Sequence, residues 1–222
     1  GWTADRIRTK TGIAERRIAA ADETAGDLCF RAAEKLFADG NLDRSTIDAL
    51  IVCTQSPDYF LPSTACVLQD RLQLPQTVAA FDVTLGCSGY TYGLWLARSL
   101  VLSDSAKNVL LLAGDTYSKY CHPKDLAVAS LFGDGATASL ITHQPDNVWA
   151  EIGPSVLGTN GQGAANLIVK AGASRLPTSE TQSDRYLYMN GAEIASFAVS
   201  TVKMVVTSLL DPPWLVSAYY GV

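Results

Sequence analysis

The sequence predicts an α/β fold in which layers of helices pack on a mostly parallel sheet. Three short runs, residues 49–53, 78–83 and 109–113, are mainly apolar, as in strands whose two faces are both buried. Apolar residues at helical spacing fill the segments between these runs. Strands that alternate with helices favour a parallel sheet with helices on its faces.

The predicted helix over residues 88–103 adds to this fold class. Arg98 is its only charged residue, so the helix is apolar nearly all round. A helix of this kind lies inside a protein, with a layer on each side. We therefore expect more layers than the three of a simple sandwich.

The other elements follow from local signals. The first helix carries apolar residues at helical spacing from Ala25 to Phe37, with Asp22 as its cap and Gly40 as its end. A second helix begins at Pro62-Ser63 and runs to Leu72. The rest follow in chain order: strands 136–141 and 148–157 joined by a polar turn at 144–147, a loop-rich segment 158–182, a brief strand 186–189 and a helix 192–210.

Composition excludes several classes of protein. The chain has 222 residues, 48% hydrophobic and 18% charged, which excludes a disordered chain and suffices for one large or two small domains. The net charge is -5, and Arg16 and Arg17 are the only adjacent basic pair, so nucleic acid is a poor candidate partner.

Cysteine usage favours a reducing compartment. The five cysteines are an odd number with no C-x-x-C pair, so a disulfide framework or a zinc site is not expected. No secretory signal is visible, and apolar runs such as 109–113 are far shorter than the roughly 20 residues of a membrane span. We expect a cytoplasmic protein without a membrane span.

Cys87 is the strongest candidate for chemistry. It lies in the segment 81–90, where a buried strand meets the apolar helix and glycines stand on either side. The N–H groups and partial positive charge of a helix N-terminus stabilise a thiolate. The alternative is a core cysteine packed as a small hydrophobe, the commoner fate of a free thiol.

Several motifs in order resemble β-ketoacyl-acyl-carrier-protein synthase III, a branch of the thiolase superfamily. The motifs are Lys10-Thr11-Gly12-Ile13 through Ala19, Glu23-Thr24, Leu61-Pro62-Ser63-Thr64-Ala65-Cys66, Phe81-Asp82-Val83 through Cys87-Ser88-Gly89-Tyr90, Leu131-Phe132-Gly133-Asp134-Gly135-Ala136 and Met189-Asn190-Gly191. The resemblance covers about residues 4–205. It implies a thiolase-like αβαβα fold with buried central helices, present here in part, and a homodimer paired through the nucleophile-bearing half.

The resemblance also implies an acyltransferase of lipid metabolism, as in fatty-acid biosynthesis. Cys87 would take an acyl group from a coenzyme A or acyl-carrier-protein thioester. A malonyl-type thioester would then lose CO2 and attack that group in a Claisen condensation. The backbone N–H of Cys87 would stabilise the oxyanion. Neither a tightly bound cofactor nor a metal is implied.

Further site residues come from the resemblance by position. The acyl-pocket wall would comprise Leu61 (reaching the partner subunit), Tyr117, Phe132, Leu167 and Leu187. The positions near the carrier's pantetheine would be Lys10, Thr11, Met189 and Gly191. For each wall residue an ordinary core role is the alternative. The loop Gly133–Ala136 would lie beside the nucleophile.

The chain also departs from the family pattern. Arg6 stands where the family stacks a tryptophan on adenine, Lys10 replaces an arginine, and Leu126 stands where a carrier-binding arginine is common. Lysine is not equivalent to arginine, so an acyl-carrier protein or an unusual acyl donor gains weight over coenzyme A. His122 and His143 are outside the family's histidine motif, which with an asparagine promotes decarboxylation.

We expect two parts, an N-terminal half at 1–145 with the nucleophile and an incomplete C-terminal half at 146–222, with the family's opening strand absent. One alternative is a non-catalytic or partner-dependent thiolase-fold subunit that binds acyl groups. Another is a cysteine hydrolase with a nucleophile elbow, which Gly89 fits and Leu85 does not.

Overall fold

The computed structural model describes residues 3–143 and 149–210, which form two compact units. The first unit holds the described residues up to Lys119 together with those of Leu131–Ile152. The second holds Tyr120–Ser130 and the described residues from Gly153 onward. The division we expected at residue 145 thus differs from these units, because Ile152 joins the first unit and the segment Tyr120–Ser130 joins the second.

A four-stranded sheet forms the centre of the first unit. Its strand order is β2 (Ala79–Val83), β1 (Ala49–Cys53), β3 (Asn108–Thr116) and β4 (Asp134–Thr142). β1 is parallel to both β2 and β3, whereas β4 is antiparallel to β3. The expected α/β fold with a mostly parallel sheet is confirmed.

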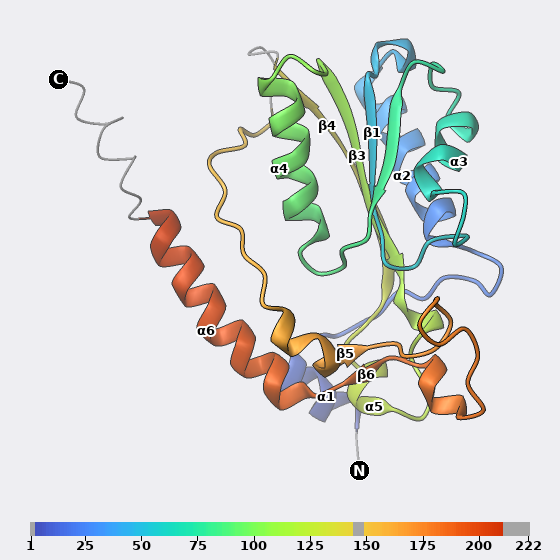
Figure 1. The fold of residues 1–222 in the computed structure, drawn as a ribbon, viewed down its shortest axis with the longest axis vertical. Coiled ribbons are helices and arrows are strands. Elements are labelled where there is room, and N and C mark those ends of the chain that lie inside the picture. Colours follow the sequence, from blue (N-terminus) through green and yellow to red (C-terminus); the bar gives the residue numbers. More distant parts are fainter. Residues whose placement is uncertain (1–2, 144–148, 211–222) are drawn as a thin grey trace. The chain divides into compact units, whose positions relative to one another are not determined.

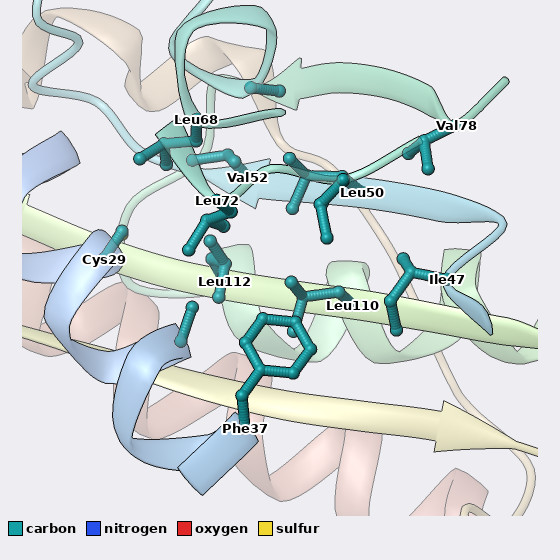
Figure 2. Close-up of a cluster of buried hydrophobic side chains, with 13 residues drawn as sticks. Cys29, Phe37, Ile47, Leu50, Val52, Leu68, Leu72, Val78, Leu110 and Leu112 are labelled. Atoms are coloured by element: carbon teal, nitrogen blue, oxygen red, sulfur yellow. The ribbon is translucent and has the colours of Figure 1, made fainter. Parts of the chain in front are cut away.

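Helices cover both faces of this sheet (Figure 1): α2 (Ala25–Gly40) and α3 (Thr64–Arg71) lie on one face, and α4 (Gly89–Leu102) on the other. Side chains of β1 alternate between the two faces, as in any strand. Leu50 and Val52 join the cluster with α2 and α3, where Phe37 points toward the strands (Figure 2). Ile51 joins the cluster with α4.

The caps of α2 differ from the predicted ones. Thr24, not Asp22, caps the N-terminus: its Oγ1 accepts a 3.2 Å hydrogen bond from Asp27 N, and Asp27 Oδ2 accepts one of 3.0 Å from Thr24 N. This reciprocal capping box satisfies two N–H groups, whereas a single Asp22 cap would satisfy one. At the other end Gly40 is still helical, and Asn41 closes the helix with φ 46°.

The burial of two elements also differs from expectation. Only Gly89, Gly93, Ala97 and Val101 of α4 are buried, one stripe at four-residue spacing, while Trp95 is 40% exposed. Within the described residues, α4 therefore packs on the sheet by one face, and its all-round burial is not found. β2 is an edge strand with partly exposed side chains, because it pairs with β1 alone.

Shorter elements complete the first unit. Helix α1 (Ala4–Thr11), which the sequence pattern did not predict, is capped by Thr3 at its N-terminus and by Gly12, with φ 72°, at its C-terminus. Two 3-10 turns, Arg44–Thr46 and Tyr117–Lys119, precede β1 and follow β3. No strand forms over residues 149–157, which corrects the expected strand 148–157. Residue 148 and the expected turn 144–147 lie outside the described residues.

The second unit has little sheet. It contains α5 (Leu126–Ala129), two 3-10 helices (Gly161–Asn166 and Gln182–Arg185), the antiparallel pair β5 (Leu167–Ile168) and β6 (Tyr188–Met189), and α6 (Gly191–Leu210). The loop-rich character of 158–182, the brief strand and the last helix match the sequence prediction.

Helix α6 has an unusual surface. None of its residues is buried, and Val199 and Leu210 are 76% and 77% exposed. It is also long and apolar enough to cross a membrane by length and composition. This helix lies outside the short apolar runs, such as 109–113, on which the prediction of no membrane span was based. A helix that is covered by other parts of a protein can have the same length and composition as a membrane-spanning helix. The expected absence of a membrane span therefore stays a prediction.

Candidate active site at the turn between β2 and α4

Cys87 lies in the tight turn that joins β2 to α4. The turn is closed by a 2.8 Å hydrogen bond from Gly89 N to Gly86 O, and α4 begins at Gly89 after the N-cap Ser88. The side chain of Cys87 is exposed. Gly89 is buried, and a Cβ there would meet Cys53 Cβ at 3.4 Å, so the helix starts in close contact with β1. The predicted strand-to-helix position of Cys87 is confirmed.

The other thiols are less suited to nucleophilic attack. Cys29, Cys53 and Cys121 are buried. Burial raises the pKa of Cys29 to about 12 and that of Cys53 to about 11, so both stay protonated near neutral pH. Cys66 is exposed, and its Sγ accepts a 3.1 Å hydrogen bond from Ser63 Oγ. Cys66 is therefore the one thiol that competes with Cys87 in exposure.

Two side chains close over Gly86, the residue before Cys87. A Cβ at Gly86 would lie 2.8 Å from Tyr117 Oη and nearer still to Gln55 Oε1, so only glycine fits without displacing them. The Tyr117 hydroxyl donates a hydrogen bond to Gln55 Oε1. The Tyr117 ring stacks on Phe132 with 5.2 Å between centroids. Tyr117 and Phe132, two predicted wall residues, are thus brought together beside the nucleophile turn.

A carboxylate of β3 fixes the segment that carries Gln55. Asp115 Oδ1 accepts four hydrogen bonds of 2.8–3.1 Å, from Thr54 Oγ1, Gln55 N, Ser56 N and Ser56 Oγ. Burial raises the pKa of Asp115, and these donors oppose that effect. Gln55 and Asp115 were not predicted from the sequence, because neither belongs to a motif and they meet across 60 positions.

Asp134 joins two motifs that are far apart in the sequence. Its Oδ2 accepts a 2.8 Å hydrogen bond from Ala19 N, and its backbone N–H donates to Arg17 O at 2.7 Å. Ser118 donates to the same carboxylate through both N and Oγ. The expected loop Gly133–Ala136 is wrong in part, because β4 begins at Asp134 and only Gly133 precedes the strand. Through Asp134, the start of β4 is tied to the segment after α1 and to the turn that carries Tyr117.

Leu61 lies on an exposed part of the first unit. Its side chain is 83% exposed, as is that of its neighbour Phe60. The following helix α3 is capped from β2, since Asp82 accepts 2.7 Å hydrogen bonds from Thr64 N and Ala65 N. Ser63 holds the N-cap position but makes no side-chain capping bond.

The remaining predicted residues divide between the two units. Thr11 ends α1, where its Oγ1 donates to Ile7 O at 2.8 Å, and Lys10 precedes it. In the second unit Leu167 pairs with Met189 between β5 and β6. Leu187 is buried there, and exposed Gly191 begins α6. A joint site of these residues with Cys87 stays a prediction.

The two histidines have no catalytic partner in the part of the chain described. His122 Nδ1 accepts a 3.1 Å hydrogen bond from Lys124 N, and its ring meets the edge of Tyr186. His143 is exposed just after β4. The described residues also contain no group of three or more His, Cys, Asp or Glu residues that could hold a metal ion.

Comparison with known proteins decides the family. Residues 81–161, which include Cys87 and the start of β4, match the family model of 3-oxoacyl-[acyl-carrier-protein] synthase III. A putative 3-oxoacyl-[acyl-carrier-protein] synthase 3 of Campylobacter jejuni is 39% identical over 89% of this chain and 58% of its own length. The chain is a 3-oxoacyl-[acyl-carrier-protein] synthase III-like protein.

Other synthase III proteins agree with this assignment. A relative from Caldanaerobacter subterraneus is 38% identical over 92% of this chain and 62% of its own length. A crystal structure of a 3-oxoacyl-(acyl-carrier-protein) synthase III shares 50% identity at a TM-score of 0.89, covering 94% of this chain and 65% of that one. The crystal structure of a 3-oxoacyl-(acyl-carrier protein) synthase from Burkholderia xenovorans shares 37% identity at a TM-score of 0.79. The match covers 94% of this chain and 64% of that one. The chain thus spans about three fifths of the length of these synthase III relatives.

Proposed function

We propose that the protein is an acyltransferase that forms a β-ketoacyl thioester by Claisen condensation on Cys87. The observation that carries the proposal is the exposed Cys87 thiol at a strand-to-helix turn, within the segment that matches the synthase III family. The high pKa of Cys29 and of Cys53 sets both thiols apart from this role.

The first step is covalent transfer of the acyl group. The Cys87 thiolate attacks the thioester carbonyl, a new carbon–sulfur bond forms, and the bond to the carrier sulfur breaks. The carrier leaves as a thiolate and takes up a proton. Among the hydrogen bonds of the described residues, none uses the backbone N–H of Cys87, so this donor is available to the developing oxyanion.

The second step joins two carbons. A malonyl-type thioester loses CO2, and its carbanion attacks the acyl carbon on Cys87. The new carbon–carbon bond forms as the bond to Cys87 Sγ breaks, which restores the thiolate. Donors that stabilise the carbanion are needed for this step, and His122 and His143 do not occupy the family's motif. The condensation is therefore a property that we assign to the whole protein.

The proposed partners follow from the same chemistry. The acyl donor is a coenzyme A or acyl-carrier-protein thioester, with Lys10, Thr11, Met189 and Gly191 near its pantetheine and Leu61, Tyr117, Phe132, Leu167 and Leu187 around the acyl chain. The protein acts as a cytoplasmic homodimer, without nucleic acid or a membrane span. Exposed Phe60 and Leu61 and the edge strand β2 support an apolar interface between copies.

The test measures which thiol takes the acyl group. The chain is incubated with acetyl-coenzyme A or acetyl-pantetheine, and the modified cysteine is mapped by mass spectrometry. We expect the acetyl group on Cys87, its loss in Cys87→Ala and its retention in the matched variant Cys66→Ala. Preferential acylation of Cys66, or of no cysteine, would contradict the proposal.

A further inference from the structure

We propose that Gln55 is a specificity-determining residue, which narrows the acyl site beside Cys87 and so favours short acyl groups. The inference rests on the proposed function, because it takes Cys87 as the acyl acceptor. Gln55 belongs to none of the motifs that carry the family resemblance. Its role follows from three contacts in the first unit.

The first contact places Gln55 at the nucleophile turn. Gln55 Oε1 and Tyr117 Oη both approach Gly86 more closely than any Cβ at that position would allow. Gly86 precedes Cys87 directly, so the two polar groups lie over the backbone that presents the thiol. Gln55 is nevertheless exposed, as Cys87 is. Its side chain therefore fills open space beside the nucleophile and is not part of the core.

The second contact fixes the end of the Gln55 side chain. The hydroxyl of Tyr117 donates to Gln55 Oε1, and the Tyr117 ring stacks on Phe132. A glutamine side chain has three rotatable bonds, and a free one would move aside for a ligand at little cost. Because Tyr117 holds it, the Gln55 side chain extends the surface formed by the stacked Tyr117 and Phe132 rings and does not move aside for a ligand.

The third contact fixes the backbone of Gln55. Asp115 Oδ1 binds the N–H groups of Gln55 and Ser56 at 2.8 and 3.0 Å, and Ser56 Oγ accepts a 2.8 Å hydrogen bond from Thr116 N. Thr54 and Ser56 are buried on either side. The backbone of Gln55 and the strand that leads into Tyr117 are thus one rigid assembly, and Asp115 is its positioning residue.

The experiment compares acyl chain lengths on wild type and Gln55→Ala. Rates of Cys87 acylation are measured by intact-protein mass spectrometry with acetyl- and octanoyl-coenzyme A. One methylene group more or less in a pocket changes the ratio of rates for two substrates by about tenfold or more. We therefore expect Gln55→Ala to raise the ratio of the octanoyl to the acetyl rate by at least about tenfold. Tyr117→Phe keeps the ring but releases Gln55, and it should shift the ratio in the same direction by a smaller factor.

Gln76→Ala is the matched control, because Gln76 is also exposed but lies in the loop before β2. It should leave the ratio unchanged. A second measurement needs no acyl transfer: alkylation of Cys87 by iodoacetamide and by N-octyl iodoacetamide should show the same shift in Gln55→Ala. Thermal melting of each variant checks that it is folded.

The two proposals fail in different ways. Absence of acyl-Cys87 in the wild type contradicts the proposed function. The ratio of Cys87 alkylation by the two iodoacetamides then still tests whether Gln55 narrows the space beside Cys87. Ratios that are equal in wild type and Gln55→Ala, in folded protein, overturn the role of Gln55. An equal shift in Gln76→Ala would overturn it too, since the effect would not depend on contact with the nucleophile turn.

Discussion

The Asp82 carboxylate on β2 accepts a 2.7 Å hydrogen bond from the backbone N–H of Thr64, the first residue of α3. A second bond of the same length comes from Ala65. One side chain thereby caps a helix and ties it to the strand that leads to Cys87. The exposed Leu61, just before this helix, is held near the same strand through the cap.

Replacement of Asp82 should destabilise the first unit. Asp82→Ala leaves two N–H groups of α3 without their acceptor, and loss of a helix cap lowers the free energy of unfolding by about 1–2 kcal/mol. Urea denaturation followed by circular dichroism measures the change. Asp70→Ala, on the exposed face of the same helix, serves as the control. An Asp82→Ala variant as stable as the wild type would show that the cap adds nothing.

Cys29 should make the protein less stable at high pH. Its pKa is about 12 when folded, against an ordinary value of 9.0. The protonated thiol therefore stabilises the fold fully below pH 9, and this contribution is lost as the pH rises toward 12. From pH 8 to 10.5 the unfolded thiol ionises while the folded one does not, a loss of about 2 kcal/mol.

The variant Cys29→Ala isolates this effect from other groups that titrate in the same range. Between pH 8 and 10.5, the free energy of unfolding of the wild type should fall by about 2 kcal/mol more than that of Cys29→Ala. Urea titrations at the two pH values give both numbers. Parallel declines in the two proteins would contradict the burial of a protonated thiol.

The protein should form a dimer at micromolar concentration. Phe60 and Leu61 expose 83% of their surface, and an apolar interface between copies would cover them. Sedimentation velocity on the wild type should show a dimer, and Phe60→Asp should shift it toward monomer. Lys107→Asp, an exposed change just before β3, is the charge control. A stable wild-type monomer would count against this interface.

The 222-residue chain should accept an acyl group on Cys87 without completing condensation. Neither His122 nor His143 occupies the family's decarboxylation motif, and His122 Nδ1 already accepts a hydrogen bond from Lys124. Loss of one oxyanion donor typically raises the activation free energy by about 3 kcal/mol, which lowers the rate more than a hundredfold. Radiolabelled acyl-thioester with malonyl-carrier should give labelled Cys87 and no ketoacyl product. Robust product would mean that one of these histidines acts after all.

Local sequence was sufficient for much of the fold. Apolar runs located β1 and most of β3, because strands buried in a parallel sheet need apolar side chains on both faces. Glycines and a strand-to-helix junction marked the turn of Cys87. The edge position of β2 and the single buried stripe of α4 could not be predicted, because burial depends on which other elements lie alongside.

The sequence by itself determined the family, the alternation of strands and helices, and Cys87 as the nucleophile candidate. Tertiary structure alone decided what surrounds that thiol. Asp115 binds the segment of Gln55 from about 60 positions away, and Asp134 binds Ala19 from 115 positions away. Such contacts leave no periodic or spaced pattern, because a carboxylate can accept backbone N–H groups from residues of any type. They become visible only when the chain has folded and the separate segments meet.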